Sequence, residues 1–259
     1  MSAPVRVAAE LAPSVWTFVA AARKRAAAPR LVAARAIAAT GAALGDDIKA
    51  LRRTAKLPMD VSVILWPHAG DEGVAPIESR EFAVVSVPKA RVIRERVAPL
   101  VRAGGLVTDV WLPHECLAGL AAARGLASAC VIIAHPGMMC VGFVMDGVVR
   151  SRYLSSETSR AAFDTESARL LARYQHISLL APHVREMGGA AEGVRVLVAG
   201  HLPGLRSAMV PLVEELDHEV DVLDADVPAP TPHPLESADP DEIAGAQLAW
   251  TLASALPGQ

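Results

Sequence analysis

Two stretches of the chain follow one plan: Val5-Arg-Val-Ala-Ala-Glu-Leu-Ala-Pro-Ser-Val-Trp-Thr-Phe-Val19 and Cys130-Val-Ile-Ile-Ala-His-Pro-Gly-Met-Met-Cys-Val-Gly-Phe-Val-Met-Asp-Gly-Val-Val149. Each is an apolar run, a short turn containing proline, and a second apolar run. The second stretch then adds an Asp146-Gly147 turn. Apolar runs rich in valine and isoleucine, separated by short turns, are typical of β-hairpins. The sequence therefore predicts two hairpins with one layout.

A third element follows the hairpins, Val194-Arg-Val-Leu-Val-Ala-Gly-His-Leu-Pro-Gly204, in which a buried strand runs into a glycine-containing turn. A helix is predicted after it, and another over residues 239–255. Between the hairpins, strands alternate with helices, which indicates a mixed α/β architecture. The expected strands there are 61–66, 82–87 and 107–112, and the expected helices are 46–56, 92–101 and 115–123.

Composition limits the classes of function. The chain has 259 residues, 52% of them hydrophobic, a net charge of −3 and a pI of about 6.2. It is long enough for two lobes, and its weak negative charge argues against nucleic-acid binding. The three cysteines lack metal-ligand spacing and stand among apolar residues, so they are expected to be buried thiols in a reducing compartment. No apolar run reaches the length of a membrane span, and we expect a cytoplasmic protein.

Four segments carry a resemblance to a known family: Phe82-Ala-Val-Val-Ser-Val-Pro-Lys-Ala-Arg91, Leu100-Val-Arg-Ala-Gly-Gly-Leu-Val-Thr-Asp-Val110, residues 194–205, and Ala244-Gly-Ala-Gln-Leu-Ala249. In this order the chain resembles the PilM family of type IV pilus assembly proteins, in a divergent and shortened form. These are actin-like proteins related to FtsA and, more distantly, to GspL.

The resemblance implies an α/β fold of the actin-like (ASKHA) type, with two lobes and duplicated hairpin-containing sheets. We expect the first lobe over residues 1–128, with a small inserted strand–helix–strand subdomain at about 79–112. The second lobe is expected over 129–259, with its small subdomain reduced because the segment between the second hairpin and Val194 is short. A cleft is expected between the turns at 11–14 and 134–137.

In this fold the hairpin turns hold phosphates through backbone N–H groups, and a nearby acid organises the metal ion. The candidate nucleotide-binding residues are Glu10, Ser14, Gly137, Gly200 and Gly204. The family's Asp-Ile-Gly turns are replaced here, and Pro13 and Pro136 each remove a donor. We therefore expect a degenerate site with no cofactor, ATP with magnesium being disfavoured. No catalytic residue and no metal site are expected, since the histidines have no ligand spacing.

The resemblance implies a non-catalytic scaffold of a type IV pilus or related secretion machine. Its expected partner is a PilN-like inner-membrane protein, bound through a cytoplasmic N-terminal peptide beside residues 82–112, together with other platform components. The chain would then be peripheral to the inner membrane. One alternative is a divergent, small actin-like phosphotransferase, although no carboxylate near the second hairpin is suited to act as general base. Another is an α/β interaction domain without nucleotide history.

Overall fold

The structure of the chain is a computed structural model, and part of the chain is described. The described residues are 5–11, 15–22, 30–38, 44–55, 60–67, 83–85, 88–135, 138–155, 181–189, 191–200, 210–223, 248–249 and 251–253. The predicted helix over 159–174 and the predicted loop over 224–237 lie outside them. Where the structure describes the expected 239–255 helix, it is helical.

The chain divides into two compact units, each assembled from more than one stretch. Unit 1 combines Met1–Glu72, Val87–Pro113 and Asp224–Gln259, and unit 2 combines Gly73–Ser86 with His114–Leu223. These limits differ from the single boundary at residue 128 that we expected from the sequence. Each unit contains one β-sheet, and the two are described separately below.

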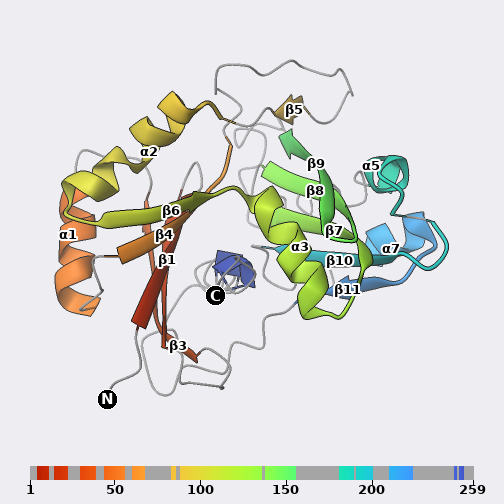
Figure 1. The fold of residues 1–259 in the computed structure, drawn as a ribbon, viewed down its shortest axis with the longest axis horizontal. Helices are drawn as coiled ribbons and strands as arrows, with labels where there is room; N and C mark the ends of the chain where they lie inside the picture. Colours follow the sequence, from red (N-terminus) through yellow and green to blue (C-terminus); the bar gives the residue numbers. More distant parts are fainter. Residues whose placement is uncertain are drawn as a thin grey trace, which may run out of the picture. The chain divides into compact units, whose positions relative to one another are not determined.

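The sheet of unit 1 has five strands in the order β3-β2-β1-β4-β6. Strands β1, β2 and β3 form an antiparallel meander, while β4 lies parallel to β1 and β6 parallel to β4. The strands are β1 (Val5–Leu11), β2 (Val15–Ala22), β3 (Arg30–Ala38), β4 (Asp60–Leu65) and β6 (Leu106–Trp111), and the helices are α1 (Leu44–Ala55) and α2 (Ala90–Arg102). Figure 1 shows α1 and α2 beside this sheet.

The sheet of unit 2 has six strands in the order β11-β10-β7-β8-β9-β5. Strands β7, β8 and β9 form an antiparallel meander, and β10 and β11 continue it in parallel. The strands are β5 (Ala83–Val85), β7 (Ser128–His135), β8 (Met138–Met145), β9 (Val148–Ser155), β10 (Arg195–Gly200) and β11 (Val220–Val222). The helices are α3 (Pro113–Ala123), α5 (Ala181–Glu186) and α7 (Val210–Leu216).

The two sheets repeat one topology, as the paired hairpins predicted. Five strands of each sheet have the same order and the same directions, and β5 is an additional strand at the edge of the second sheet. The register matches as well. Leu11 pairs with Trp16 in the first hairpin and Ala134 with Met139 in the second, with four residues between the partners in both. Glu10 in sheet 1 therefore corresponds to Ile133 in sheet 2.

The main core of each unit follows the alternation of side chains along the strands. In unit 1 the odd residues of β1 pack with Ile48 of α1 and with Val97 and Leu100 of α2. In unit 2 the even residues of β7 pack with Val184 of α5 and with side chains of α7. In both sheets, residues of the opposite parity face the other side. On that side of sheet 2, α3 approaches so closely that a Cβ at Gly142 would lie 2.3 Å from Leu117 Cδ1.

Glycines at positive φ end elements where the sequence predicted turns. Gly104, at φ 84°, follows the last turn of α2, and the Gly105 N–H donates to the Leu100 carbonyl. This arrangement satisfies helix carbonyls that would otherwise lack partners. Asp146 and Gly147 have φ of 51° and 81° between β8 and β9, as expected for a two-residue hairpin turn.

The predicted strand–helix–strand grouping over residues 79–112 is divided between the two sheets. Its first strand, β5, pairs with β9 in unit 2, whereas β6 is the fifth strand of sheet 1 and α2 packs against that sheet. The reason is topological, because a strand parallel to β4 needs a crossover helix and α2 supplies it. Sequence analysis also missed α5 and β11, which are short.

Candidate functional site

In each unit the end of the first hairpin strand lies beside the end of a strand parallel to it. Leu11 pairs with Leu65 in unit 1, and the Trp66 N–H donates to the Leu11 carbonyl at 3.1 Å. In unit 2, Ala134 pairs with Gly200. The carboxyl ends of parallel strands meet at one edge of a sheet, which is the usual position of ligand sites in α/β folds. A ligand site in either unit is therefore expected at these strand ends.

The polar centre of unit 1 at this edge is Glu10. Its side chain is 1% exposed, and its Oε1 atom accepts a 2.7 Å hydrogen bond from the indole Nε1–H of Trp66. Its Oε2 atom is buried without a hydrogen-bond partner among the described residues. Directly opposite on β2 stands Thr17, which is also buried. Glu10 is thus enclosed in the unit and held by an aromatic donor.

Burial controls the charge of this carboxyl. Loss of hydration raises the pKa of Glu10 to about 7 from its ordinary value of 4.5, and the hydrogen bond from Trp66 partly opposes the shift. A ligand for a magnesium ion bridging phosphates has to be ionised and reachable by the ion and its waters. Glu10 is neither fully ionised near pH 7 nor exposed. As arranged here, its carboxyl does not fit the role of the acid in a nucleotide site.

A further hydrogen bond ties Trp66 to the crossover helix. The Arg96 Nη1 of α2 donates to the Trp66 carbonyl at 2.7 Å. Trp66 is fully buried, and the following Pro67 is buried as well. The chain of contacts Glu10–Trp66–Arg96 therefore links β1, the end of β4 and α2. These contacts stabilise unit 1 and leave Trp66 committed to the interior.

Unit 2 is apolar at the corresponding positions. Ile133 is fully buried where unit 1 has Glu10, and Cys140 stands opposite it where unit 1 has Thr17. His135, at the end of β7, is 3% exposed, and Gly200 ends β10 beside Ala134. No carboxylate lies at this end of β7 or β10 among the described residues.

Of the five residues predicted to bind a nucleotide, two lie in the described part of the chain. Glu10 and Gly200 lie at the strand ends of their own units, as the hairpin plan predicted. Ser14, Gly137 and Gly204 lie outside the described residues, and the cleft expected between the two turns stays a prediction. Sequence analysis missed Trp66 and Arg96. The signal in the sequence was a tryptophan directly before Pro67, at the end of a valine-rich strand.

The cysteines and His114 of α3 lie in packed surroundings. All three cysteines are buried and none forms a disulfide, and burial raises the pKa of the Cys130 thiol to about 12. His114 bonds to Tyr153, with Nδ1 2.7 Å from the phenol oxygen, and burial lowers the pKa of its ring. The described residues contain no group of three or more side chains suited to hold a metal ion.

Comparisons with known proteins identify the class of fold. Models of known protein families give no match to the chain, and no curated protein matches it in sequence. Solved structures do match it, and together with the duplicated strand order they show that the chain has the actin-like (ASKHA) fold predicted from the hairpins.

Two of these structures are similar over nearly the whole chain. One is the ethanolamine utilization protein EutJ from Carboxydothermus hydrogenoformans, with a TM-score of 0.59 and 12% identity, covering 94% of this chain and 90% of that one. The other is a chain of the PilM–PilN type IV pilus biogenesis complex, also with a TM-score of 0.59 and 12% identity, covering 97% of both chains. At this identity the likeness establishes the fold.

Proposed function

We propose that the chain is a non-catalytic scaffold of a type IV pilus or related secretion machine, which binds the cytoplasmic tail of a PilN-like inner-membrane protein. The observation that carries the proposal is the state of Glu10. The acid of the first hairpin is buried, bonded to Trp66 and of raised pKa, so it is built into the unit instead of being presented to a metal ion.

The similarity to a chain of the PilM–PilN complex supports the choice of machine and partner. No described helix of this chain is long and apolar enough to cross a membrane. Attachment to the inner membrane would then come through the partner. A divergent phosphotransferase, the alternative, has less support, because the described ends of β1 and β7 offer no exposed carboxylate to accept a substrate proton.

Within residues 82–112, the region expected to bind the partner, β5 and β6 are both edge strands, and β5 is better suited to pair with an extended peptide. Both β5 and β6 are last strands of their sheets. Strand β6 has an irregularity at Thr108 and an exposed Asp109, and bulges and charges of this kind discourage pairing at an edge. Strand β5 pairs regularly with β9 over its three residues. A tail peptide adding beside β5 would gain backbone hydrogen bonds.

The test uses a fluorescent synthetic peptide of the cytoplasmic N-terminus of the single-span membrane protein encoded beside this chain. Successive amides of a strand point to opposite edges. One of the variants Val84→Pro and Val85→Pro therefore removes a donor to β9, and the other removes a donor facing the peptide. We expect the variant that keeps the wild-type melting temperature to lose at least tenfold in affinity. Absence of binding to the wild type would refute the partner.

Nucleotide binding is tested separately by isothermal titration with magnesium ATP. We expect no micromolar binding by the wild type. Ala12→Gly alone is expected to restore no hydrolysis, because the second turn also lacks an acid. Micromolar affinity together with hydrolysis would favour the phosphotransferase. Peptide binding without nucleotide binding is the result that the scaffold requires.

A further inference from the structure

The chain separates its charges between two short segments of equal length. Residues 89–102, which contain α2, carry five cationic side chains and one acidic one, a formal charge of +4. Residues 210–223, which contain α7 and β11, carry five acidic side chains and no lysine or arginine, a formal charge of −5. The first segment belongs to unit 1 and the second to unit 2. A net charge of only −3 for the whole chain conceals this asymmetry.

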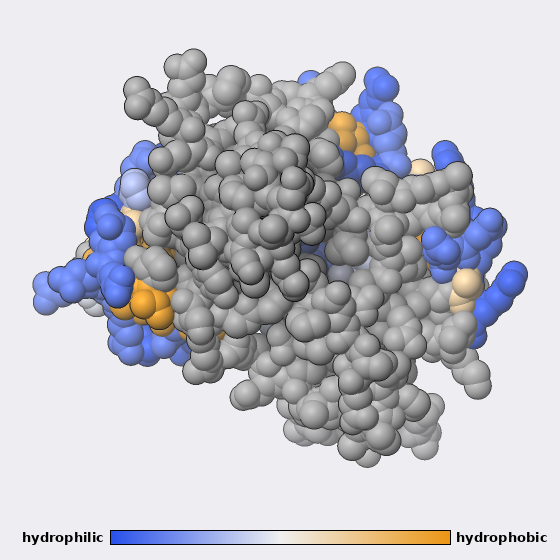
Figure 2. Space-filling model, turned by 180° about the vertical axis from the view of Figure 1, so that it is seen from behind, coloured by the Kyte–Doolittle hydropathy of each residue, from blue (hydrophilic) through white to orange (hydrophobic). Residues whose placement is uncertain are grey.

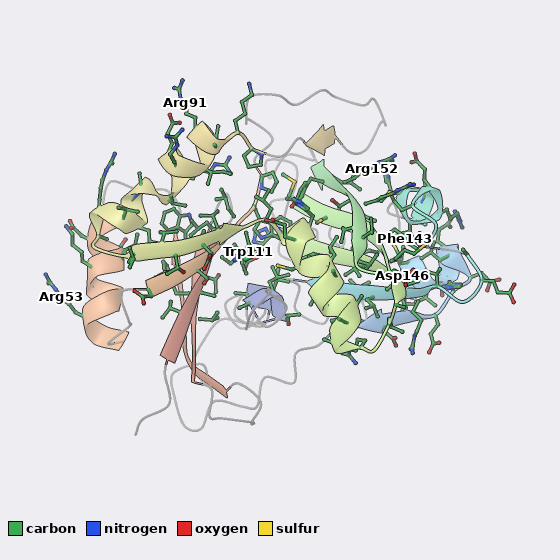
Figure 3. The ribbon with its side chains drawn as sticks, viewed as in Figure 1. Arg53, Arg91, Trp111, Phe143, Asp146 and Arg152 are labelled. Carbon is green, nitrogen blue, oxygen red and sulfur yellow. The ribbon has the colours of Figure 1, made fainter. Side chains whose placement is uncertain are left out.

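Arg91, Arg94 and Arg102 of α2 are exposed because the opposite side of the helix is packed, whereas Arg96 is half-buried and bonded to Trp66. Val97 and Leu100 are buried in the core of unit 1. Figure 3 shows Arg91 projecting away from the sheet. Two exposed apolar side chains border these cations, Val101 at 51% and Leu106 at 57%. We call this surface the basic face, and it consists of Lys89, Arg91, Arg94, Val101, Arg102 and Leu106, all exposed.

The acids of the second segment are exposed for a similar reason. Leu212 and Leu216 anchor α7 in the core of unit 2. Val210, 50% exposed, and Val213, 36% exposed, lie on the outside of the helix. We call this surface the acidic face, and it consists of Val210, Val213, Glu214, Glu215, Asp217 and Glu219, all exposed.

Ion pairs neutralise part of each face. On the basic face Arg91 pairs with Glu95 at 2.8 Å. Beside the acidic face, Arg185 lies 3.5 Å from Glu215, and Arg195 pairs with Glu219 and Asp221. When Glu95 is included, the basic face has a formal charge of about +3. When Arg185, Arg195 and Asp221 are included, the acidic face has a formal charge of about −3. Each face also has exposed apolar residues. On the side that Figure 2 shows, the coloured residues include orange hydrophobic areas next to blue hydrophilic ones.

We propose that the basic face of one copy of the chain binds the acidic face of a second copy. The two faces are opposite in sign and similar in the size of their retained charge, and both include exposed valines. They are different surfaces on different units, so the contact is heterologous: the first copy keeps its acidic face free and the second keeps its basic face free. Association therefore proceeds head to tail and depends on concentration and ionic strength. This self-association goes beyond the proposed scaffold function and does not require it.

Sedimentation velocity of the full chain tests the proposal. At about 50 mM salt we expect the sedimentation coefficient to rise with protein concentration, and raising the salt to about 500 mM should weaken association at least tenfold. The variant Arg91→Glu with Arg94→Glu should remain monomeric, as should Glu214→Arg with Glu219→Arg. The matched control, Arg124→Glu with Arg150→Glu, alters exposed arginines outside both faces. It should associate like the wild type.

Mixing the two face variants gives the sharpest result. The unchanged acidic face of the first variant can bind the unchanged basic face of the second, and the two reversed faces are complementary as well. The mixture should therefore associate although neither variant does so alone. Melting curves establish that both variants are folded. A wild type that is monomeric at every concentration and salt, or a mixture that stays monomeric, overturns the proposal. So does a monomeric wild type that floats with phosphatidylglycerol vesicles through Arg91 and Arg94, since the basic face would then serve a membrane.

Discussion

The two sheets share strand order, direction and hairpin register, and they differ at one matched pair of residues near the end of the hairpin. Sheet 1 has Glu10 opposite Thr17, held by Trp66, whereas sheet 2 has Ile133 opposite Cys140. Both positions are buried. The backbone plan therefore tolerates either a carboxyl or an alkyl group at this position. What decides between them is whether a donor such as the indole of Trp66 is available, because buried polar groups need partners.

The largest loss of stability is expected when a carboxyl group is placed in sheet 2 at the position that corresponds to Glu10. The variant Ile133→Glu places an acid at a fully buried position that has an apolar neighbour where sheet 1 has a threonine. Because charge burial without a partner is costly, we expect a loss of about 4 kcal/mol in the free energy of unfolding at pH 8. Urea denaturation measures it. A loss below about 1 kcal/mol would show that the two positions are equivalent in environment as well as register.

The second largest loss of stability is expected where α3 packs on the second sheet. Gly142 of β8 corresponds to Val19 of β2, and a Cβ there would meet Leu117 of α3 at 2.3 Å and the Arg150 carbonyl at 3.0 Å. The variant Gly142→Val is expected to cost about 3 kcal/mol, since α3 has to move.

The control for this variant is Leu117→Ala, which opens the space that the added side chain needs. The loss in the double variant should be smaller than the sum of the two single losses. Strict additivity in urea denaturation would contradict the close approach of α3.

The third effect depends on pH. The folded-state pKa of Glu10, about 7, lies above its ordinary value of 4.5. The contribution of Glu10 to stability is therefore greatest below about pH 4.5 and is lost as pH rises through 7, because ionisation of the buried acid opposes folding. Glu10→Gln keeps an acceptor for Trp66 and removes the charge. It should raise the unfolding free energy by about 3 kcal/mol at pH 8 and by little near pH 4. An increase that is the same at both pH values would exclude titration of Glu10.

The smallest effect is expected at the β8–β9 turn. Gly147 has φ of 81°, and no atom lies within 4 Å of the position that a Cβ would occupy. Gly147→Ala therefore carries only the conformational cost of a side chain at positive φ, about 1 kcal/mol. Compared with Gly142, where space is the limit, it separates backbone strain from overpacking. Thermal denaturation measures both variants, and a loss at Gly147 equal to that at Gly142 would contradict the distinction.

Much of the fold was predictable because local patterns carry it. The alternation of apolar residues and the turns at Pro13, Pro136 and Asp146-Gly147 located both hairpins to within a residue or two. The grouping of residues 79–112 was less accurate, because a strand has the same pattern whichever sheet it joins. Strand β11 is three residues long and too short for periodicity to indicate.

The candidate site was also predictable in part: the positions of its residues were, and the state of Glu10 was not. Sequence comparison with the family pattern identified Glu10 and Gly200 as residues at the hairpin and strand ends, and both lie there. It could not indicate the state of Glu10. That state depends on Trp66, which is 56 residues away in sequence, and on the burial that raises its pKa.

The sequence by itself determined the two hairpins, the mixed α/β class and the duplicated plan, since these follow from periodicity and turn chemistry over a few residues. Only the tertiary structure decided that Glu10 is enclosed and bonded to an indole, that β5 and β6 belong to different sheets, and that α3 requires a glycine at position 142. Each of these depends on contacts between residues distant in the chain. Hydration, pairing and steric space at a residue are set by such neighbours, and local patterns do not encode which neighbours those are.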